Sequence, residues 1–324
     1  MARYGDYVAR ITSKRAPALP VAAPQSQTPV RERGPAHTVP GVASIALLDV
    51  LRGPRRRGHV IAVVPGVIYL DFGESTGEPR VIALSASGTI CLPNAIALKL
   101  SPTDLAAAAS AEDPDDTWAG NGRVTACGLE VQVRRWWDPC PVFGPLSRGR
   151  IEHGVAILGR VYSAAGDRPG LDGHDSLAAL ATCCAAGDLA GAVELAEGLV
   201  GLGPGLMPSG DSMISGLLLA LRLLGGATVG GTRPVWLADW LAAAVTGYAD
   251  QRTTPLGAAL LSCAARGQAA EEVSAVLRGM AGQEPVEPAA RRLLSVGRAS
   301  GAELTWGLMA GCRAALALSG PDAR

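Results

Sequence analysis

The sequence predicts an α+β fold, with a β-rich, meander- or barrel-like N-terminal domain followed by a mostly α-helical domain. Two patterns predict it. Short runs rich in Val and Ile, separated by turn residues, fill 59–138, and helical periodicity continues from Pro145 almost to the end. A third observation concerns the core: 48% of the 324 residues are hydrophobic but only 4% are aromatic. The core must therefore be packed from small aliphatic side chains.

Residues 1–40 are expected to form a flexible extension, because six prolines are mixed there with polar residues and no sustained period appears. Pairing of part of this segment with another subunit is the alternative. A short helix is expected at 42–51. The β-rich domain is assigned to 41–145 and the helical domain, which carries a glycine-rich motif, to 146–320.

Strands are expected in five short runs after residue 58, HVIAVV, GVIYLDF, RVIALS, GTICL and AIALKL, because turn-forming Pro, Gly, Asn and Ser residues separate them. A short helix at 104–111 interrupts the series. Asn121-Gly122 then opens a last pair of strands, RVTACG and LEVQVRRWWD. Together these runs predict a meander of short strands joined by tight turns.

Nine helices are expected in the second domain. Asp188 is predicted to cap one of them, and Pro234 lies at a first-turn position of another. The predicted ranges are 147–162, 175–186, 188–200, 211–224, 234–249, 255–266, 269–281, 287–296 and 301–318.

Charge and composition exclude several classes of protein. Lys plus Arg and Asp plus Glu both number 29, so the basic excess typical of nucleic-acid-binding proteins is missing. Neither the seven Cys nor the four His follow a metal-ligand spacing, so we expect free thiols, no metal and no cofactor. The N-terminus does not resemble a signal peptide, and the most apolar stretch, 213–221, is too short to cross a membrane. A cytoplasmic protein that does not bind membranes is therefore expected.

The most unusual segment is GLGPGLMPSGD at 201–211, which leads directly into an apolar helix. Glycines allow a ligand to approach the main chain, and a helix N-terminus offers N–H groups and partial positive charge. This is the chemistry of an anion or phosphate site, with Ser209 as the expected N-cap. A tight, well-capped connection between packed helices is the alternative. Asp211 could hold an NH₂ group or accept a proton, or it could be a simple first-turn acid.

Two other predicted helix starts resemble this one. Thr254 precedes Pro255, with Arg252 beside it, and Ser300 to Glu303 has the spacing of a capping box. Ordinary capping explains each start alone. We hypothesise that the starts at Ser209, Thr254 and Ser300 face one pocket that binds a small anionic metabolite, since Gly or Arg flanks all three.

The segment GLGPGLMPSGDSMISGLLLALRLL resembles the hallmark GLGPGLTPSGDDFLxGxLxAL of the AllH family, which includes a subunit of oxamate carbamoyltransferase from anaerobic allantoin (purine) breakdown. The run HVIAVVPGVIYLDFG resembles the family's N-terminal β region. QRTTPLGAALLSCAARG and LLSVGRASGAELTWGLMAG resemble its second and third motifs. The resemblance extends over most of residues 43–318.

The resemblance implies a carbamoyltransferase-type subunit that works in a multi-subunit assembly with sister subunits. The implied reaction is phosphorolysis of oxalurate to oxamate and carbamoyl phosphate. Asp211 is then the expected catalytic group. The expected substrate- and phosphate-binding residues are Gly203, Gly205, Ser209, Gly210, Arg252, Thr253, Thr254, Arg298, Ser300 and Glu303.

This sequence departs from the family motifs at polar positions. Met207 replaces a Thr, Ser212 an Asp, and Gly257 a Ser, while Arg298 replaces a His and Glu303 an Asp. The glycine framework is retained better than the polar groups. Two alternatives are therefore kept: a non-catalytic ligand-binding or assembly subunit on the same scaffold, and a divergent small-molecule enzyme.

Overall fold

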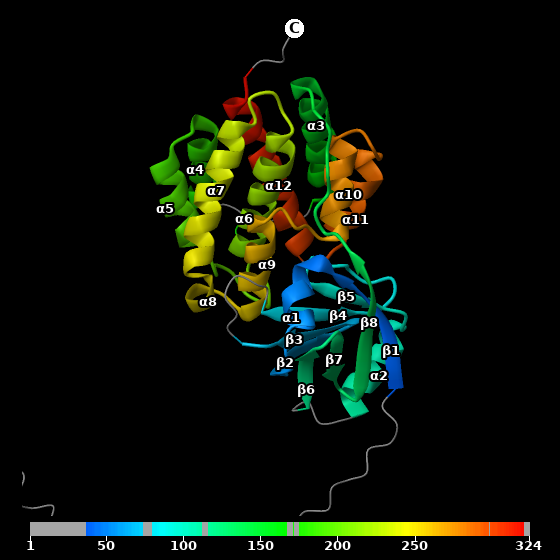
Figure 1. Ribbon diagram of the computed structural model, residues 1–324. Helices are drawn as coiled ribbons and strands as arrows, with labels where there is room; N and C mark the ends of the chain where they lie inside the picture. Colours follow the sequence, from blue (N-terminus) through cyan, green and yellow to red (C-terminus); the bar gives the residue numbers. More distant parts are fainter. Residues whose placement is uncertain are drawn as a thin grey trace, which may run out of the picture. The chain divides into compact units, whose positions relative to one another are not determined.

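The computed structural model describes residues 37–73, 80–111, 116–166, 171, 175–297 and 299–320 of the chain. Within these residues a closed eight-stranded barrel is followed by a mostly helical region (Figure 1). The predicted α+β class is therefore confirmed.

The barrel strands follow the spatial order β1-β5-β4-β3-β2-β6-β7-β8. Most neighbours pair antiparallel, but β4 pairs parallel with β5, and β1 closes the barrel by pairing parallel with β8. Three short helices, η1, α1 and α2, lie between strands in the sequence. The bounds are β1 His37–Ser44, η1 Ile45–Leu47, α1 Leu48–Arg52, β2 Arg56–Val64, β3 Val67–Asp71, β4 Val81–Ser85, β5 Ala95–Leu98, α2 Pro102–Ala111, β6 Thr117–Gly120, β7 Arg123–Ala126 and β8 Leu129–Trp137.

Turn residues fix two of the hairpins, as the sequence predicts. Asn121 and Gly122 have φ values of 52° and 74°, and this pair of left-handed residues joins β6 to β7. Two such residues in succession match the right-handed twist of adjacent strands. In the turn that joins β2 to β3 only Gly66 is left-handed, with φ of 80°, and it follows Pro65.

Two local predictions in the β-rich part were wrong. The segment expected to be helical at 42–51 begins in β1, which continues to Ser44, and only the remainder is helical. Strand β1 also includes residues 37–40, which were assigned to the extension. GTICL is not a strand; instead the Cys91 carbonyl accepts a hydrogen bond from the Glu271 backbone N–H at 3.0 Å. In both places a partner far away in the sequence decides the backbone conformation.

Strands β3 and β4 are buried on both faces, which explains their continuous apolar runs. Ile68 and Ile82 point into the barrel core. Tyr69, Val81 and Ala83 belong instead to the core that the helices form. The barrel and the helices thus share one hydrophobic core across this sheet face.

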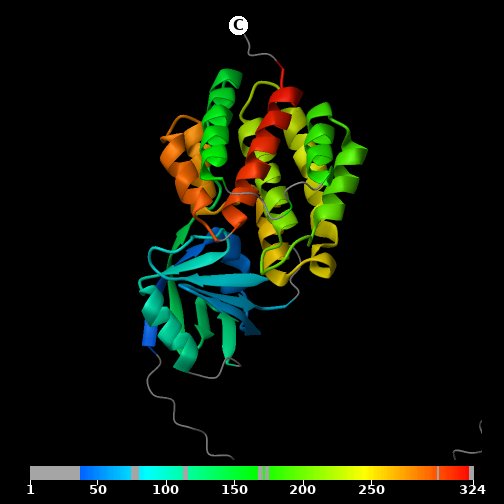
Figure 2. The same cartoon turned by 180° about the vertical axis from the view of Figure 1, so that it is seen from behind.

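The helical region agrees closely with the predicted ranges. Helices α6 and α12 pack against one another in its centre (Figure 2). Helix α6 continues directly into the π-helical segment η2. The bounds are α3 Arg148–Ala165, α4 Asp175–Ala186, α5 Leu189–Leu199, α6 Ser209–Leu219, η2 Ala220–Gly225, α7 Thr232–Gly247, α8 Ala249–Arg252, α9 Pro255–Ala265, α10 Glu271–Met280, α11 Val286–Leu294 and α12 Ser300–Leu318.

Glycine allows α6 and α12 to approach closely. A Cβ atom at Gly216 would lie 2.4 Å from the Leu304 carbonyl oxygen, and one at Gly307 would lie 2.1 Å from the Met213 carbonyl oxygen. Every residue of α6 is buried. The helix that follows the glycine-rich motif is therefore the centre of the helical core.

The predicted caps are confirmed at some helix starts and wrong at others. The Thr254 and Asp188 side chains accept hydrogen bonds from the backbone N–H groups of Gly257 and Gly191, as predicted. At α6 and α12, however, Pro208 and Ala299 are the N-caps, and Ser209 and Ser300 are the first helical residues. The predicted capping box at Ser300 is therefore not formed.

No helix among the described residues is long and apolar enough to span a membrane. All seven cysteines lie in the described ranges and are free thiols. Burial raises the pKa of the Cys184 and Cys312 thiols to about 12, which is typical of inert core cysteines.

Candidate functional site

A cavity of about 1160 Å³ lies where the helices meet the barrel. Three helices each present one stripe of residues to it: Ser215 and Leu219 from α6, Leu256, Leu260 and Ala264 from α9, and Ser300, Glu303 and Leu304 from α12. Spacings of three and four residues place side chains on one face of a helix. The barrel contributes residues of the β2–β3 hairpin and of the 88–93 loop, and further wall residues come from 204–207, 268–273 and 292–297.

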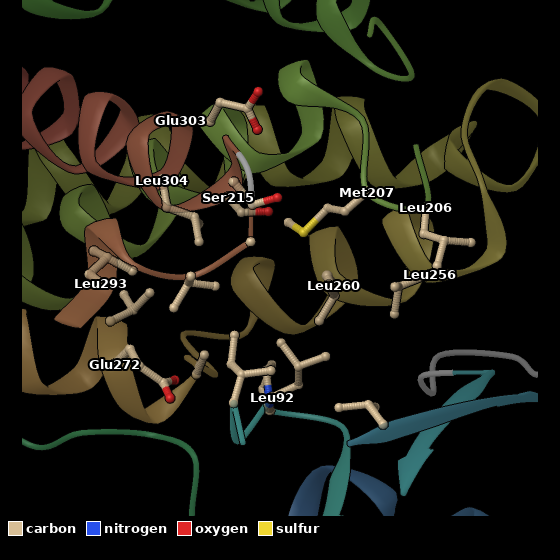
Figure 3. A pocket seen from close by; sticks show the side chains of 18 of the residues that line it. Leu92, Leu206, Met207, Ser215, Leu256, Leu260, Glu272, Leu293, Glu303 and Leu304 are labelled. Atoms are coloured by element: carbon tan, nitrogen blue, oxygen red, sulfur yellow. The ribbon is translucent and has the colours of Figure 1, made fainter. Parts of the chain in front are cut away.

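Most of the cavity wall is apolar, but a few polar side chains face it. Ser215 is 3% exposed, and its hydroxyl has no hydrogen-bond partner among the described residues. Glu303 is 2% exposed. Figure 3 shows Ser215 and Glu303 in one part of the cavity and Glu272 well apart from them, beyond Leu293. Apolar cavities with a few placed polar groups are typical of small-molecule sites.

Glu272 is the second carboxylate of the cavity. Its Oε2 atom is buried and finds no hydrogen-bond partner in the part of the chain that the structure describes. Burial raises the pKa of the Glu272 carboxyl and the charge of Glu271 raises it further, while backbone N–H groups and the Arg292 guanidinium lower it in part. The cavity therefore contains two acidic side chains, and the exposed Arg292 is on its wall.

The glycine-rich loop supplies main chain and apolar side chains to the cavity. Gly205 lines it with φ of 99°, and a Cβ atom there would meet nothing within 4 Å. Leu206 and Met207 follow it in the wall (Figure 3). Gly203, with φ of 109°, packs against Ser209 instead, since a Cβ atom would lie 2.8 Å from the Ser209 hydroxyl oxygen. Of these two glycines, only Gly205 leaves the backbone open to a ligand.

Asp211 is fully buried and is not one of the residues that line the cavity. Its Oδ1 accepts a hydrogen bond from the Gly201 backbone N–H at 2.8 Å, and its Oδ2 accepts one from the Thr253 hydroxyl. Burial raises the pKa of the Asp211 carboxyl, and these two hydrogen bonds oppose the shift. In this chain the carboxylate joins the glycine-rich loop to the start of α9.

Other predicted site residues, near the start of α9 and in α6, also make structural contacts within the protein. The Thr254 hydroxyl donates to the Leu206 carbonyl, and the Arg252 guanidinium donates to the Glu197 carbonyl at 3.0 Å. Gly210 fits tightly, because a Cβ atom there would lie 1.9 Å from the Leu199 carbonyl oxygen. Arg298 lies outside the described residues.

Of the predicted site residues, Gly205, Ser209, Ser300 and Glu303 come together in the cavity wall. The starts of α6, α9 and α12 contribute to it, and so does the start of α10. Some of their N–H groups already have partners: Gly210 donates to the Leu202 carbonyl and Gly301 to the Val296 carbonyl. Helix N-termini that meet at one cavity favour a ligand with negative charge, whereas the two carboxylates, Glu272 and Glu303, favour a ligand with hydrogen-bond donors.

Sequence reasoning missed Ser215, Glu272, Arg292 and the barrel residues Tyr69 and Leu92 in this wall. Ser215 had a weak signal, because it lies one helical turn after Asp211 on a helix of apolar residues. The other missed residues gave no signal in the sequence, because a Glu in the first turn of a helix or a Tyr in a strand is common and does not by itself indicate a site. No group of three or more His, Cys, Asp or Glu side chains suited to a metal ion occurs in the described ranges.

Comparison with known proteins supports the motif assignment. The model of the family described as oxamate carbamoyltransferase subunit AllH matches residues 199–312. Comparisons with curated proteins and with solved structures gave no significant match. The matched segment includes every residue of the cavity wall from Pro204 to Leu304. Over residues 199–312 the chain thus matches the AllH family, and the resemblance predicted from the motifs is confirmed for that segment, which does not include the β-strand run.

Proposed function

We propose that this chain is a subunit of a carbamoyltransferase-type enzyme, and that the cavity between barrel and helices is its substrate site. The proposal depends on one observation: the segment that matches the AllH model also forms the helical walls of a large cavity that has a few polar side chains. The family description names a subunit, so we also propose that the chain works with sister subunits in the cytoplasm. In this proposal 41–145 and 146–320 are two domains that share the site.

The proposed substrate carries both a carboxylate and an amide or ureido group, as oxamate and oxalurate do. Its N–H groups would donate to the Glu303 or Glu272 carboxylate, which accept without rearrangement. Its carboxylate, and the phosphate or carbamoyl phosphate that takes part in the transfer, would lie toward Arg292, Gly205 and the first turns of α6 and α12.

A second candidate function, a non-catalytic ligand-binding or assembly subunit, is favoured by Asp211. Both of its oxygens are occupied by protein donors, and the carboxylate lies off the cavity. In this second proposal the motif residue Asp211 has only a structural role, while the cavity still binds a ligand.

The test is binding of oxamate, inorganic phosphate and carbamoyl phosphate by the purified full chain, measured by calorimetry and thermal unfolding. A ligand that binds only the folded state adds about 2.7 kcal/mol of stability at a hundredfold above its Kd. We expect at least one of the three to raise Tm. Addition of the sister subunits should then give phosphorolysis of oxalurate.

Gly205→Val is the diagnostic variant and Gly122→Val its matched control. Both glycines have left-handed backbone and open space around the Cβ position, so the two substitutions carry a similar strain. Only Gly205 lines the cavity. Loss of the ligand response in Gly205→Val alone supports the proposal. A flat response of the unmodified chain to all three ligands overturns it.

A further inference from the structure

The cavity is much larger than the substrates considered above. Oxamate has six non-hydrogen atoms, which occupy about 180 Å³ at roughly 30 Å³ per atom, the share of a molecule in liquid water. The cavity measures about 1160 Å³. Most of it would remain unfilled around so small a ligand, and cavities above about 300 Å³ commonly hold molecules of drug size.

The unfilled part of the cavity is apolar. Leu256 and Leu260 of α9 form one wall, and Val67 and Leu92 of the barrel lie in another. All four side chains are less than 9% exposed. Such walls suit a hydrocarbon group, because each methylene group buried there contributes about 0.8 kcal/mol, or about fourfold in affinity.

The polar end of the cavity is formed where α6 and α12 touch. Gly216 of α6 packs against the Leu304 carbonyl of α12. Ser215 and Glu303 directly precede these two residues, so they lie at the same contact between the helices. Both side chains are more than nine-tenths buried and line the cavity. The Ser215 hydroxyl has no protein partner within the described ranges, which leaves it to a ligand. A carboxylate has about four acceptor positions, so Glu303 can accept ligand N–H groups beside its protein contact.

We propose that the cavity binds a small molecule with a neutral carboxamide head and an aliphatic body of at least four carbons. The carbonyl oxygen of the head accepts from the Ser215 hydroxyl, and its NH₂ group donates to Glu303. The body lies along α9 and the barrel. A carboxylate head is disfavoured at this end by the charge of Glu303. This inference rests on the proposed function for the place of the ligand and goes beyond it in the class of ligand.

The test is calorimetry of the full chain with acetamide, butyramide and hexanamide, and with hexanoate as the anionic counterpart of hexanamide. We expect affinity to increase about fourfold for each added methylene. Hexanamide should bind at least tenfold more tightly than hexanoate. Equal affinity along the series, no binding of any amide, or tighter binding of hexanoate overturns the proposal.

Ser215→Ala tests the head group, and Ser212→Ala is its matched control on the same buried helix. The Ser212 hydroxyl is already bonded to the Pro208 carbonyl and is not part of the cavity wall. Ser215→Ala should weaken hexanamide about fivefold, the usual value of one hydrogen bond, while Ser212→Ala should not. Equal affinities of the two variants for hexanamide contradict the assigned head-group contact.

The two proposals fail in different ways. If the amides show the chain-length effect but oxamate, phosphate and carbamoyl phosphate do not bind, the carbamoyltransferase proposal is wrong and the ligand class stands. If oxamate binds but longer amides gain nothing, only the ligand class is wrong.

Discussion

At the scale of single residues, Asp211 shows how a motif residue can be kept for structure. Its carboxylate accepts hydrogen bonds from the Gly201 backbone N–H and the Thr253 hydroxyl. It therefore connects the glycine-rich loop, α6 and the start of α9. A buried N–H that loses its acceptor costs about 1–3 kcal/mol. The residue is needed for the fold around the cavity whether or not it also takes part in a reaction.

Substitution of Asp211 separates hydrogen bonding from charge. Asp211→Ala should lower the free energy of unfolding by about 3 kcal/mol, because the Gly201 N–H then lacks an acceptor and a gap is left in a fully buried position. Asp211→Asn should cost less than half as much, since its amide can accept from Gly201 and donate to Thr253. Urea unfolding at pH 7 measures both. Equal losses in the two variants would contradict this assignment.

The pH dependence of stability, compared between wild type and Asp211→Asn, gives a prediction with a definite direction. Burial raises the pKa of Asp211 above its ordinary value of 3.8, so the folded protein binds this proton more tightly than the unfolded chain does. The contribution of Asp211 to stability is fully present below the unfolded pKa and is lost as the pH rises through the folded pKa. Wild type should therefore lose stability relative to Asp211→Asn between pH 4 and pH 7. A difference that does not change with pH contradicts the raised pKa.

At the scale of elements, the contact between α6 and α12 depends on the absence of side chains. Gly307→Ala should cost about 3 kcal/mol, because the new Cβ would lie 2.1 Å from the Met213 carbonyl oxygen and 2.9 Å from the Leu217 nitrogen. Backbone atoms cannot move aside as a flexible side chain can. The helices must separate, and the cavity between them must change shape.

Gly159→Ala is the matched control for this substitution. Gly159 is also inside a helix, α3, but the nearest atom to its Cβ position is the Met309 sulfur at 3.8 Å. Alanine there should stabilise the protein by about 0.5–1 kcal/mol through helix propensity alone. Urea unfolding of both variants checks the pair. Similar effects of the two substitutions would show that the helix contact is not close.

At the scale of the whole molecule, the barrel and the helices should unfold together. Tyr69, Val81 and Ala83 of the barrel belong to the helical core. Arg80 binds the buried Asp71 of the barrel through two hydrogen bonds of 2.9 and 2.8 Å and reaches Asp250 of α8 at 3.3 Å. Separation of the two parts would expose apolar surface, which is costly, and would break the contact between Arg80 and Asp250.

Calorimetry tests this expectation. We predict a single transition with calorimetric and van't Hoff enthalpies that agree, and the same midpoint by far-ultraviolet circular dichroism and by tryptophan fluorescence. Two separated transitions would mean that the barrel and the helices are stable independently, and that the cavity between them can open without unfolding.

Prediction from the sequence worked best where local signals were strong. The helices from 148 to 318 follow their apolar periodicity and match the predicted ranges within a few residues. Asn121-Gly122 correctly placed a hairpin. Strand β1 was missed because its partners, β5 and β8, are about 55 and 90 residues away, and its own sequence, HTVPGVAS, contains both Pro and Gly. The caps of α6 and α12 were each displaced by one residue.

The sequence by itself determined the α+β class, the order of its two parts, the glycine-rich helix start and the family resemblance, because each depends on residues close together in the chain. Only the tertiary structure decided what these residues face. Packing in three dimensions buried Asp211 and gave both Asp211 and the exposed Arg252 backbone partners that hold loops together. It also brought Ser215, Glu272 and the barrel face into one cavity. A pattern along the chain records which side chains are buried, but not which distant segment covers them.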